Sequence, residues 1–322
     1  MRTIVLTEPG GPRQLTVAER PVPTPGPGQA LLRTEAAAVS YYETLMRSGA
    51  VPMPIPLPMV FGSEAAGVVT EVGAGVDNAL IGKRMVGMTG VGAYAEYVAA
   101  PASMLTTVPD GVSATDAVAV TMSAATALLL LSTARLADTD KVLIEGASGV
   151  VGGYLVQLAR LQGVTTVIAT AGGPAKRTPA IEAGADIVID HTNPDWPDQV
   201  RAALNGSTLD VVFESIGGDS ARALLDTLAP GSGRMVFYGT LSGQPPTITP
   251  TDLLHRGVSL IGAGGLSAVA ARLPAAQAEV LNLTATGALR PLVDSVLPLA
   301  AAAKAHQRIE DRQAIGKIVL TP

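Results

Sequence analysis

The sequence of 322 residues contains no cysteine, which excludes disulfide bonds, a thiolate nucleophile and any cysteine-ligated metal site. Histidine is scarce as well, because the chain has only 3, at His191, His255 and His306. These positions lie far apart in the sequence, so we expect no bound metal. The net charge is −5 and basic residues form no run, so neither a nucleic acid nor an anionic membrane surface is an expected partner.

The chain has little that resembles a membrane segment. Residues 117–134 carry no charge, but they include several serines and threonines, and Asp116 and Arg135 bound them closely. We interpret this segment as a helix buried between domains rather than a membrane span. The apolar run at the N-terminus is too short for a signal peptide and meets Glu8 at once, so a cytoplasmic location is expected.

The pattern of residues changes part-way along the chain. In the first hundred residues, short apolar segments alternate with proline and glycine, which predicts a β-rich domain. From about residue 140, strand and helix patterns alternate, as in a doubly wound parallel sheet. We therefore predict an α/β protein with a first domain at 1–117, a nucleotide-binding domain at 118–265 and a C-terminal return to the first domain at 266–322.

The predicted elements are short. The β-rich part has predicted strands at 3–6, 15–19, 29–39, 65–72, 84–88 and 93–99. In the second part, strands at 141–145, 165–170, 187–190, 211–214, 234–238 and 259–262 alternate with helices at 152–162, 177–183, 197–204 and 219–228. A helical region at 266–286 and a last strand at 317–320 end the chain. Residues 51–58 alternate proline with apolar residues, which predicts an extended segment used mainly for packing.

A glycine-rich turn at 146–153 is the strongest single motif. An apolar run ends at Ile144, Gly146, Gly149 and Gly152 recur at every third position, and an amphipathic segment follows from Tyr154. This layout is typical of a strand, a phosphate-binding loop and a helix, where glycine lets the backbone approach a ligand. N–H groups at the start of the helix would face a pyrophosphate, although a simple tight turn has the same pattern.

The next strand carries information on the cofactor. Folds that prefer NAD usually place an acidic residue at its end to bind the ribose hydroxyl groups. Here the strand ends at Ala171 without a carboxylate, and Lys176 and Arg177 follow. Both can bind a 2′-phosphate, although a solvated cationic pair at a helix start is the simpler alternative. Together these features favour NADPH.

The order of these parts resembles one family. Beside the glycine turn, the segments 38–49, 61–76, 92–98, 184–186, 215–218 and 316–319 are similar to those of the zinc-independent medium-chain dehydrogenase/reductase superfamily. Within it, the chain resembles the quinone oxidoreductase-like (zeta-crystallin-like) branch over essentially its whole length. The resemblance implies a Rossmann-type doubly wound sheet and a mainly β GroES-like catalytic domain. Zinc-using relatives carry a cysteine and a Gly-His-Glu motif where this chain has Ser40 and Gly62-Ser63-Glu64, which again indicates no metal.

The resemblance also implies roles for individual residues. Ser148, Gly149, Val150 and Val151 would contact the pyrophosphate. Gly172, Lys176, Arg177 and His191 would surround the 2′-phosphate. Ser215, Gly239, Thr240 and Leu241 would line the cofactor at the strand ends, and Lys317 would close over it.

The resemblance also implies candidate catalytic residues. Ser40 and Thr126 would lie near the nicotinamide, and Tyr41 and Tyr42 are the candidates for a proton donor, with simple packing as the alternative for each tyrosine. The substrate cleft would also include residues 53–57, Leu241 and the segment near Gly264. Glu64 lies within an apolar run and is interpreted as a hydrogen-bonded buried carboxylate rather than a base.

These features predict an NADPH-dependent, metal-free reductase that transfers hydride to a quinone or another electron-poor conjugated carbonyl. The first alternative is an enoyl-thioester or alkenal double-bond reductase, for which Arg47 is a candidate phosphate contact. The second is a non-catalytic NADPH-binding sensor or structural protein, because fold does not determine function. The resemblance also implies a homodimer joined through the sheet edge near residues 259–262.

Overall fold

The computed structural model describes residues 1–51, 57–263 and 266–322. The chain divides into two compact units, which we call unit 1 (Met1–Met122 with Gln277–Pro322) and unit 2 (Ser123–Ala276). The divisions fall within helices α2 (Ala114–Ala134) and α8 (Leu266–Ala285), whereas the sequence placed them at 117/118 and 265/266. Residues 53–56 and Gly264, which were expected to line the substrate cleft, lie outside the described residues.

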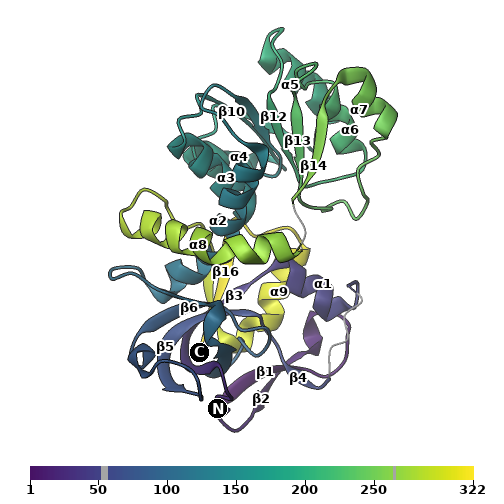
Figure 1. Ribbon diagram of the computed structural model, residues 1–322. Helices are drawn as coiled ribbons and strands as arrows, with labels where there is room; N and C mark the ends of the chain where they lie inside the picture. The colour runs from purple at the N-terminus through teal and green to yellow at the C-terminus, as the bar shows by residue number, and fades with distance from the viewer. Residues whose placement is uncertain (52–56, 264–265) are drawn as a thin grey trace. The chain divides into compact units, whose positions relative to one another are not determined.

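Unit 2 contains a six-stranded parallel sheet, as predicted. Its strands are β9 (Lys141–Ile144), β10 (Thr166–Ala171), β11 (Ile187–Asp190), β12 (Val211–Glu214), β13 (Arg234–Phe237) and β14 (Ser259–Gly262). The spatial order is β11-β10-β9-β12-β13-β14, and every neighbouring pair is parallel. This is the Rossmann order, in which the chain changes direction of winding between the first strand, β9, and the fourth, β12. Strands β12, β13 and β14 can be followed side by side in Figure 1.

Helices cover both faces of this sheet. They are α3 (Val150–Leu161), α4 (Arg177–Glu182), α5 (Trp196–Leu204), α6 (Asp219–Leu225) and α7 (Pro250–Arg256). On one face, α5 and α6 bury Val200, Leu204 and Leu224 in a core that also contains Leu143 and Val212 of the sheet. Figure 1 shows α3 and α4 on the other side of the strands. The predicted doubly wound arrangement is therefore present.

Unit 1 is mainly β. A seven-stranded sheet has the order β15-β16-β3-β5-β6-β8, with β7 paired to β3, and a small sheet has the order β2-β1-β4. The strands are β1 (Arg2–Leu6), β2 (Leu15–Glu19), β3 (Gln29–Val39), β4 (Met59–Val60), β5 (Glu64–Val72), β6 (Arg84–Met88), β7 (Tyr97–Pro101), β8 (Leu105–Thr107), β15 (Val293–Pro298) and β16 (Lys317–Thr321). Because β16 pairs with β3, the C-terminal segment belongs to the same sheet as the N-terminal strands of unit 1.

Two α-helices belong wholly to unit 1, α1 (Tyr41–Ser48) and α9 (Ala302–Glu310). Short 3₁₀ turns occur in both units at Pro12–Gln14, Asn78–Leu80, Ala102–Met104, Pro174–Lys176 and Leu299–Ala301. The core of unit 1 joins β1, β3 and β16 to α9 through Leu6, Leu32, Leu320 and Ala305.

Helix α2 is long and apolar enough to cross a membrane, judged by length and composition alone. However, 67% of its most apolar window is buried inside the structure, which is how the core helix of a folded domain behaves. A helix was predicted here, and its burial agrees with the expectation of a packed segment.

The strand predicted at 93–99 begins later, as β7, and the cause is local. Ala93 and Tyr94 donate their N–H groups to Gly62 and Phe61, and the Tyr94 carbonyl accepts from Ile4. These residues therefore join the small sheet to the chain between β4 and β5 instead of extending β7. No element was predicted between residues 287 and 316, where the structure has β15 and α9.

Candidate functional site

The glycine turn follows β9 and leads into α3. Gly146 has a φ of 62°, and Gly149 is the N-terminal cap of α3 without a side-chain capping bond. Gly152 packs so closely that a Cβ there would lie 2.5 Å from the Gly146 carbonyl oxygen. The turn therefore needs glycine for its own close packing, and the α3 N-terminus presents N–H groups that no cap side chain occupies. Ser148, Val150 and Val151 lie at this turn, half-buried.

His191 is connected to the glycine turn through Thr170. The Thr170 hydroxyl accepts the Gly146 N–H at 3.2 Å, and His191 Nδ1 lies 3.2 Å from the same hydroxyl oxygen. On the other side of the ring, a Cβ on Gly172 would lie 2.9 Å from His191 Nε2. Glycine at 172 thus lets the imidazole lie against the end of β10, and Gly172 and His191 are neighbours in the structure.

Asp190 holds the loop that carries the two basic residues. Its Oδ1 accepts hydrogen bonds from the N–H groups of Gly173 and Thr192, both at 2.9 Å, and from the Thr192 hydroxyl at 2.7 Å. These bonds, with the Thr192 hydroxyl contributing most, lower the pKa of Asp190 to about 2. Lys176, half-buried, ends the 3₁₀ turn that follows Gly173, and exposed Arg177 begins α4. Sequence reasoning had not singled out Asp190, because it ends the third strand rather than the second.

The loops after β12 and β13 lie against each other. Leu241 donates its N–H to the Ser215 carbonyl at 3.0 Å, and a Cβ on Gly239 would lie 3.0 Å from that same oxygen. Gly218 donates to the Pro245 carbonyl at 3.1 Å. The structure therefore brings Ser215, Gly239, Thr240 and Leu241 to one edge of the sheet, beside the strand pair at which the winding changes direction.

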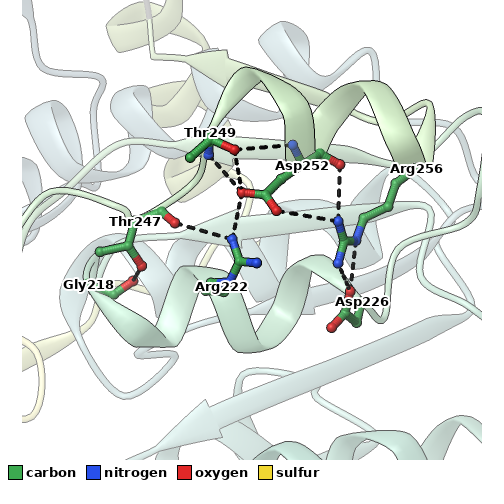
Figure 2. Close-up of polar contacts among 7 residues, drawn as sticks. All are labelled: Gly218, Arg222, Asp226, Thr247, Thr249, Asp252 and Arg256. Atoms are coloured by element: carbon green, nitrogen blue, oxygen red, sulfur yellow. Dashed lines mark hydrogen bonds and ion pairs between the residues drawn. The ribbon is translucent and has the colours of Figure 1, made fainter.

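An exposed polar network joins α6 to α7 (Figure 2). Arg222 donates to the Asp252 carboxylate, and Arg256 contacts both Asp226 and Asp252. Thr249 and Asp252 form a reciprocal capping box at the start of α7. The hydrogen bond from Arg222, followed by those from Thr249, holds the pKa of Asp252 well below its usual range. The network anchors the far end of the loop that contains Thr240 and Leu241, since α7 begins where this loop ends.

In unit 1, Ser40 caps helix α1. Its hydroxyl accepts the Glu43 N–H at 3.2 Å, and its own N–H donates to Glu43 Oε2 at 2.9 Å, which completes a capping box. Glu43 also accepts from the Ser63 N–H and hydroxyl at 2.8 and 2.7 Å and from the Tyr94 hydroxyl at 2.8 Å. Tyr41 and Tyr42 follow the cap with side chains 41% and 52% exposed, so core packing does not account for either.

Thr126 lies on α2 and is half-buried within unit 2. His306, for which the sequence offered no motif, is fully buried in unit 1, and its Nε2 lies 3.2 Å from the Tyr94 hydroxyl. Among residues 1–51, 57–263 and 266–322, no group of three or more histidine, aspartate or glutamate side chains is arranged to hold a metal ion.

Lys317, expected to close over the cofactor, is buried at the start of β16 and faces Glu64 of β5. The distance from Lys317 Nζ to Glu64 Oε2 is 4.0 Å, and both side chains are almost fully buried. Burial raises the pKa of Glu64 to about 7, while the Lys317 ammonium acts in the opposite direction. Glu64 is therefore a buried carboxyl group, as predicted, but it titrates near neutral pH.

The raised pKa of Glu64 predicts a pH-dependent stability. Between the unfolded pKa of 4.5 and the folded pKa of about 7, the folded chain keeps a proton that the unfolded chain loses. Glu64 therefore lowers the free energy of unfolding by about 3 kcal/mol as pH rises through this interval, at about 1.4 kcal/mol per pKa unit. Burial lowers the pKa of His306 from 6.5 to about 3. Between these two values His306 raises the free energy of unfolding as pH rises, which is the opposite of the effect of Glu64. We expect the free energy of unfolding of the wild type to fall relative to that of Glu64→Gln as pH rises from 4.5 to about 7. A difference between the two proteins that stays constant with pH would contradict the prediction.

Comparisons with known proteins agree with this architecture. Residues 26–110 match the family model of the alcohol dehydrogenase GroES-like domain, and residues 183–320 match that of the zinc-binding dehydrogenases. A 2-haloacrylate reductase from a Burkholderia species is 34% identical over 99% of this chain and 98% of its own length. A quinone oxidoreductase of Pseudomonas aeruginosa is 32% identical over 97% of both chains. The crystal structure of Escherichia coli quinone oxidoreductase complexed with NADPH has a TM-score of 0.90 and 29% identity over 100% of both chains.

The chain belongs to the medium-chain dehydrogenase/reductase superfamily, in its quinone oxidoreductase-like branch. The predicted fold class, a Rossmann-type sheet with a GroES-like domain, is confirmed. As a member of this branch, the protein is an NAD(P)H-dependent oxidoreductase.

Proposed function

We propose that this medium-chain reductase uses NADPH and transfers hydride, without a metal, to a quinone or another electron-poor conjugated carbonyl. The observation that carries the cofactor half of the proposal is the edge of the unit 2 sheet. Three features lie there, at the carboxyl ends of the adjacent strands β9 and β10. They are the glycine turn after β9, the absence of an acidic residue at the end of β10, and the Lys176–Arg177 pair that follows β10.

The residues at this edge suit a dinucleotide phosphate. The N–H groups of Val150 and Val151, at the start of α3 where no side chain caps the helix, would bind the pyrophosphate, since the helix dipole favours negative charge there. The Gly149 N–H already donates to the Gly146 carbonyl at 2.8 Å and shapes the turn instead. Lys176, Arg177 and His191 would surround the 2′-phosphate, on a loop that Asp190 holds in place. Ser215 and residues 239–241 would line the nicotinamide half, with Thr126 on α2 of the same unit. When bound, NADPH supplies the hydride.

Hydride transfer to a quinone depends more on the orientation of the substrate against the nicotinamide than on acid catalysis. Reduction of a quinone gives a stabilised phenolate, which needs little help from a proton donor. The exposed Tyr41 and Tyr42, on the first turn of α1, are the candidates to protonate or hydrogen-bond a less acidic product. Similarity to quinone oxidoreductases from Pseudomonas aeruginosa and Escherichia coli supports this substrate class.

Reduction of a conjugated carbon–carbon double bond is the second candidate, favoured by the similarity to a 2-haloacrylate reductase. An enoyl-thioester substrate has less support, because Arg47, the expected phosphate contact, is only 1% exposed. Its guanidinium donates to the Gly10 carbonyl and to Glu310 inside unit 1. Arg47 therefore holds α1 to α9 and the N-terminal segment instead of facing a ligand.

Stopped-flow oxidation of NADPH by three acceptors tests the choice. We expect 9,10-phenanthrenequinone to react faster than 2-chloroacrylate and crotonyl-CoA by at least about tenfold, equivalent to about 1.4 kcal/mol in activation free energy. If 2-chloroacrylate reacts faster than the quinone, the substrate class is a conjugated acid and the quinone proposal is wrong. Tight NADPH binding without turnover of any of the three acceptors would contradict the proposed substrate class.

The edge strand β14 supports a second proposal, that the protein is a homodimer. Among the described residues, β14 pairs with β13 alone, so its outer side offers main-chain groups to another strand. Two copies joined there would extend the sheet across the molecule. Sedimentation velocity should show a species of twice the chain mass, and a species of one chain mass at micromolar concentration would contradict the proposal. The cytoplasmic location also remains a prediction.

A further inference from the structure

Two buried glutamates lie side by side at the strand pair where the sheet changes its winding. Glu214 ends β12, and Glu145 follows the last residue of β9. The two strands are neighbours, with Phe213 opposite Ile144, and the Glu145 N–H donates to the Phe213 carbonyl at 3.1 Å. The side chains of Glu145 and Glu214 are 1% and 0% exposed. Each glutamate directly precedes one of the two loops expected to hold the cofactor.

One oxygen of each carboxyl group organises the neighbouring loop. Glu214 Oε1 accepts the N–H groups of Ile216, at 2.8 Å, and Gly217. Glu145 Oε1 accepts the Ser220 hydroxyl, and the Ser215 N–H also hydrogen-bonds to the Glu145 carboxyl group. The pair therefore holds the loop at 215–218 and the start of α6 against the end of β9.

The second oxygen of each carboxyl group has no such donor. Among the described residues, Oε2 of Glu145 and Oε2 of Glu214 are both buried and receive no hydrogen bond from an N–H or hydroxyl group. The two side chains are, however, within hydrogen-bonding distance of each other. A single proton between them would satisfy both oxygens, whereas two carboxylates would place like charges together in a buried site.

The surroundings of the pair favour keeping this proton. Burial, followed by the charge of Glu214, raises the pKa of Glu145 well above its ordinary value. Tyr238, just after β13, is a titratable group close to the pair, and burial together with both glutamates keeps its pKa high enough that the phenol stays neutral. On the β10 side, His191 reaches the glycine turn through Thr170.

We propose that Glu145 and Glu214 share one proton and act together as a positioning pair for the two cofactor loops, so that NADPH affinity falls when the proton is lost. The inference rests on the proposed NADPH site. Loss of the proton leaves two adjacent carboxylates that repel each other at the base of both loops. It also adds a negative charge beside the turn expected to bind the pyrophosphate, since Glu145 directly precedes Gly146 in the chain.

Glu145→Gln is the informative variant because its side chain imitates the protonated state. The glutamine oxygen can accept from Ser220, and its NH₂ group can donate to Glu214 Oε2. Glu214→Gln imitates the protonated state of the other glutamate, and it replaces Glu145→Gln in the experiment if that variant does not fold. Glu182→Gln, which removes the same group from an exposed position on α4, is the matched control.

NADPH binding, followed by nicotinamide fluorescence, should be measured from about pH 7.5 to about pH 10, above the phosphate pKa of about 6. We expect wild type and Glu182→Gln to lose about tenfold more affinity than Glu145→Gln over this range, equivalent to about 1.4 kcal/mol of binding free energy. Titration of lysine affects all three proteins alike and cancels in the ratio. Parallel profiles for all three would overturn the proposal.

Infrared spectroscopy of the cofactor-free protein separates failure of this inference from failure of the NADPH assignment. At about pH 8, where ordinary carboxyl groups are ionised, the wild type and Glu182→Gln should show a C=O stretch of a protonated carboxyl that Glu145→Gln lacks. If the band is present but NADPH does not bind, the cofactor assignment is wrong. The proposed dependence of NADPH affinity on the shared proton is then wrong as well. If NADPH binds tightly but the band is unchanged in Glu145→Gln, the shared proton is wrong.

Discussion

Lys176→Ala should weaken NADPH binding by about 10- to 100-fold while leaving NADH binding within about twofold. The physical reason is that an ammonium bound to a phosphate contributes about 1.5–3 kcal/mol, and only NADPH carries the 2′-phosphate. Lys176 is suited to this contact because the turn that carries it is held by the hydrogen bond from the Gly173 N–H to Asp190. Fluorescence titration with each cofactor measures the two dissociation constants directly.

Lys141→Ala is the matched control, since it removes the same charge from the first residue of β9, at the opposite edge of the same sheet. We expect it to change the affinities for NADPH and NADH by similar, small factors. A Lys176→Ala variant that loses equal affinity for both cofactors would show that Lys176 does not bind the 2′-phosphate. In that case Arg177 or His191 would be the next residue to substitute.

The nucleotide-binding unit could be predicted well because its determinants are local. Each strand from β9 to β14 is a short apolar run, and the predicted bounds of all six lie within one residue of the observed ones. Buried parallel strands leave little choice of pattern, and the connecting helices are amphipathic. The order of the strands then follows from right-handed crossovers and from the position of the glycine turn.

The elements that were missed depend on weaker or non-local signals. Helix α7 buries none of its residues fully, so it lacks an apolar stripe, although Thr249 and Asp252 formed a readable capping box with Pro250 at the first helical position. Strand β15 is parallel to β16 and only partly buried, so its sequence shows no clear alternation. Its existence depends on a partner that lies more than twenty residues later in the chain.

The residues of the candidate site likewise differ in whether the local sequence predicts them. Gly146 and Lys176 could be named from local motifs and Ser215 from the family resemblance. The pairing of Glu145 with Glu214 could not be predicted, because the two residues are 69 positions apart and only the strand register brings them together. Ser40 illustrates a different difficulty. The sequence Ser40-Tyr-Tyr-Glu43 is a capping box, and that structural role was readable, but the family resemblance directed attention to its place near the nicotinamide.

Glu43→Ala should lower the free energy of unfolding of unit 1 by about 4 kcal/mol, which is a large effect for one substitution. Glu43 is 1% exposed, and its carboxylate accepts hydrogen bonds from Ser40, Ser63 and Tyr94. Alanine would leave these buried donors without an acceptor and would remove half of the capping box. Urea unfolding followed by far-UV circular dichroism measures the loss.

The single tryptophan, Trp196, allows the two units to be distinguished, because it lies on α5 in unit 2. We expect Glu43→Ala to shift the circular dichroism transition more than the tryptophan fluorescence transition. Glu71→Ala, an exposed change on β5 of the same unit, should alter stability by no more than about 0.5 kcal/mol. A shift seen only in the fluorescence of Trp196 would contradict the assignment of Glu43 to the stability of unit 1.

Glu43→Gln connects this stability to the proposed reaction. The amide keeps one accepting oxygen, but its NH₂ group meets donors from Ser40 and Tyr94 or from Ser63, so we expect an intermediate loss of about 2 kcal/mol. Because the capping box sets the start of α1, the same variant should displace Tyr41 and Tyr42 and reduce quinone turnover at saturating NADPH. NADPH affinity should change little, since the proposed phosphate contacts belong to unit 2. If turnover and NADPH affinity fell together, Glu43 would support the fold as a whole and not the placement of the catalytic helix.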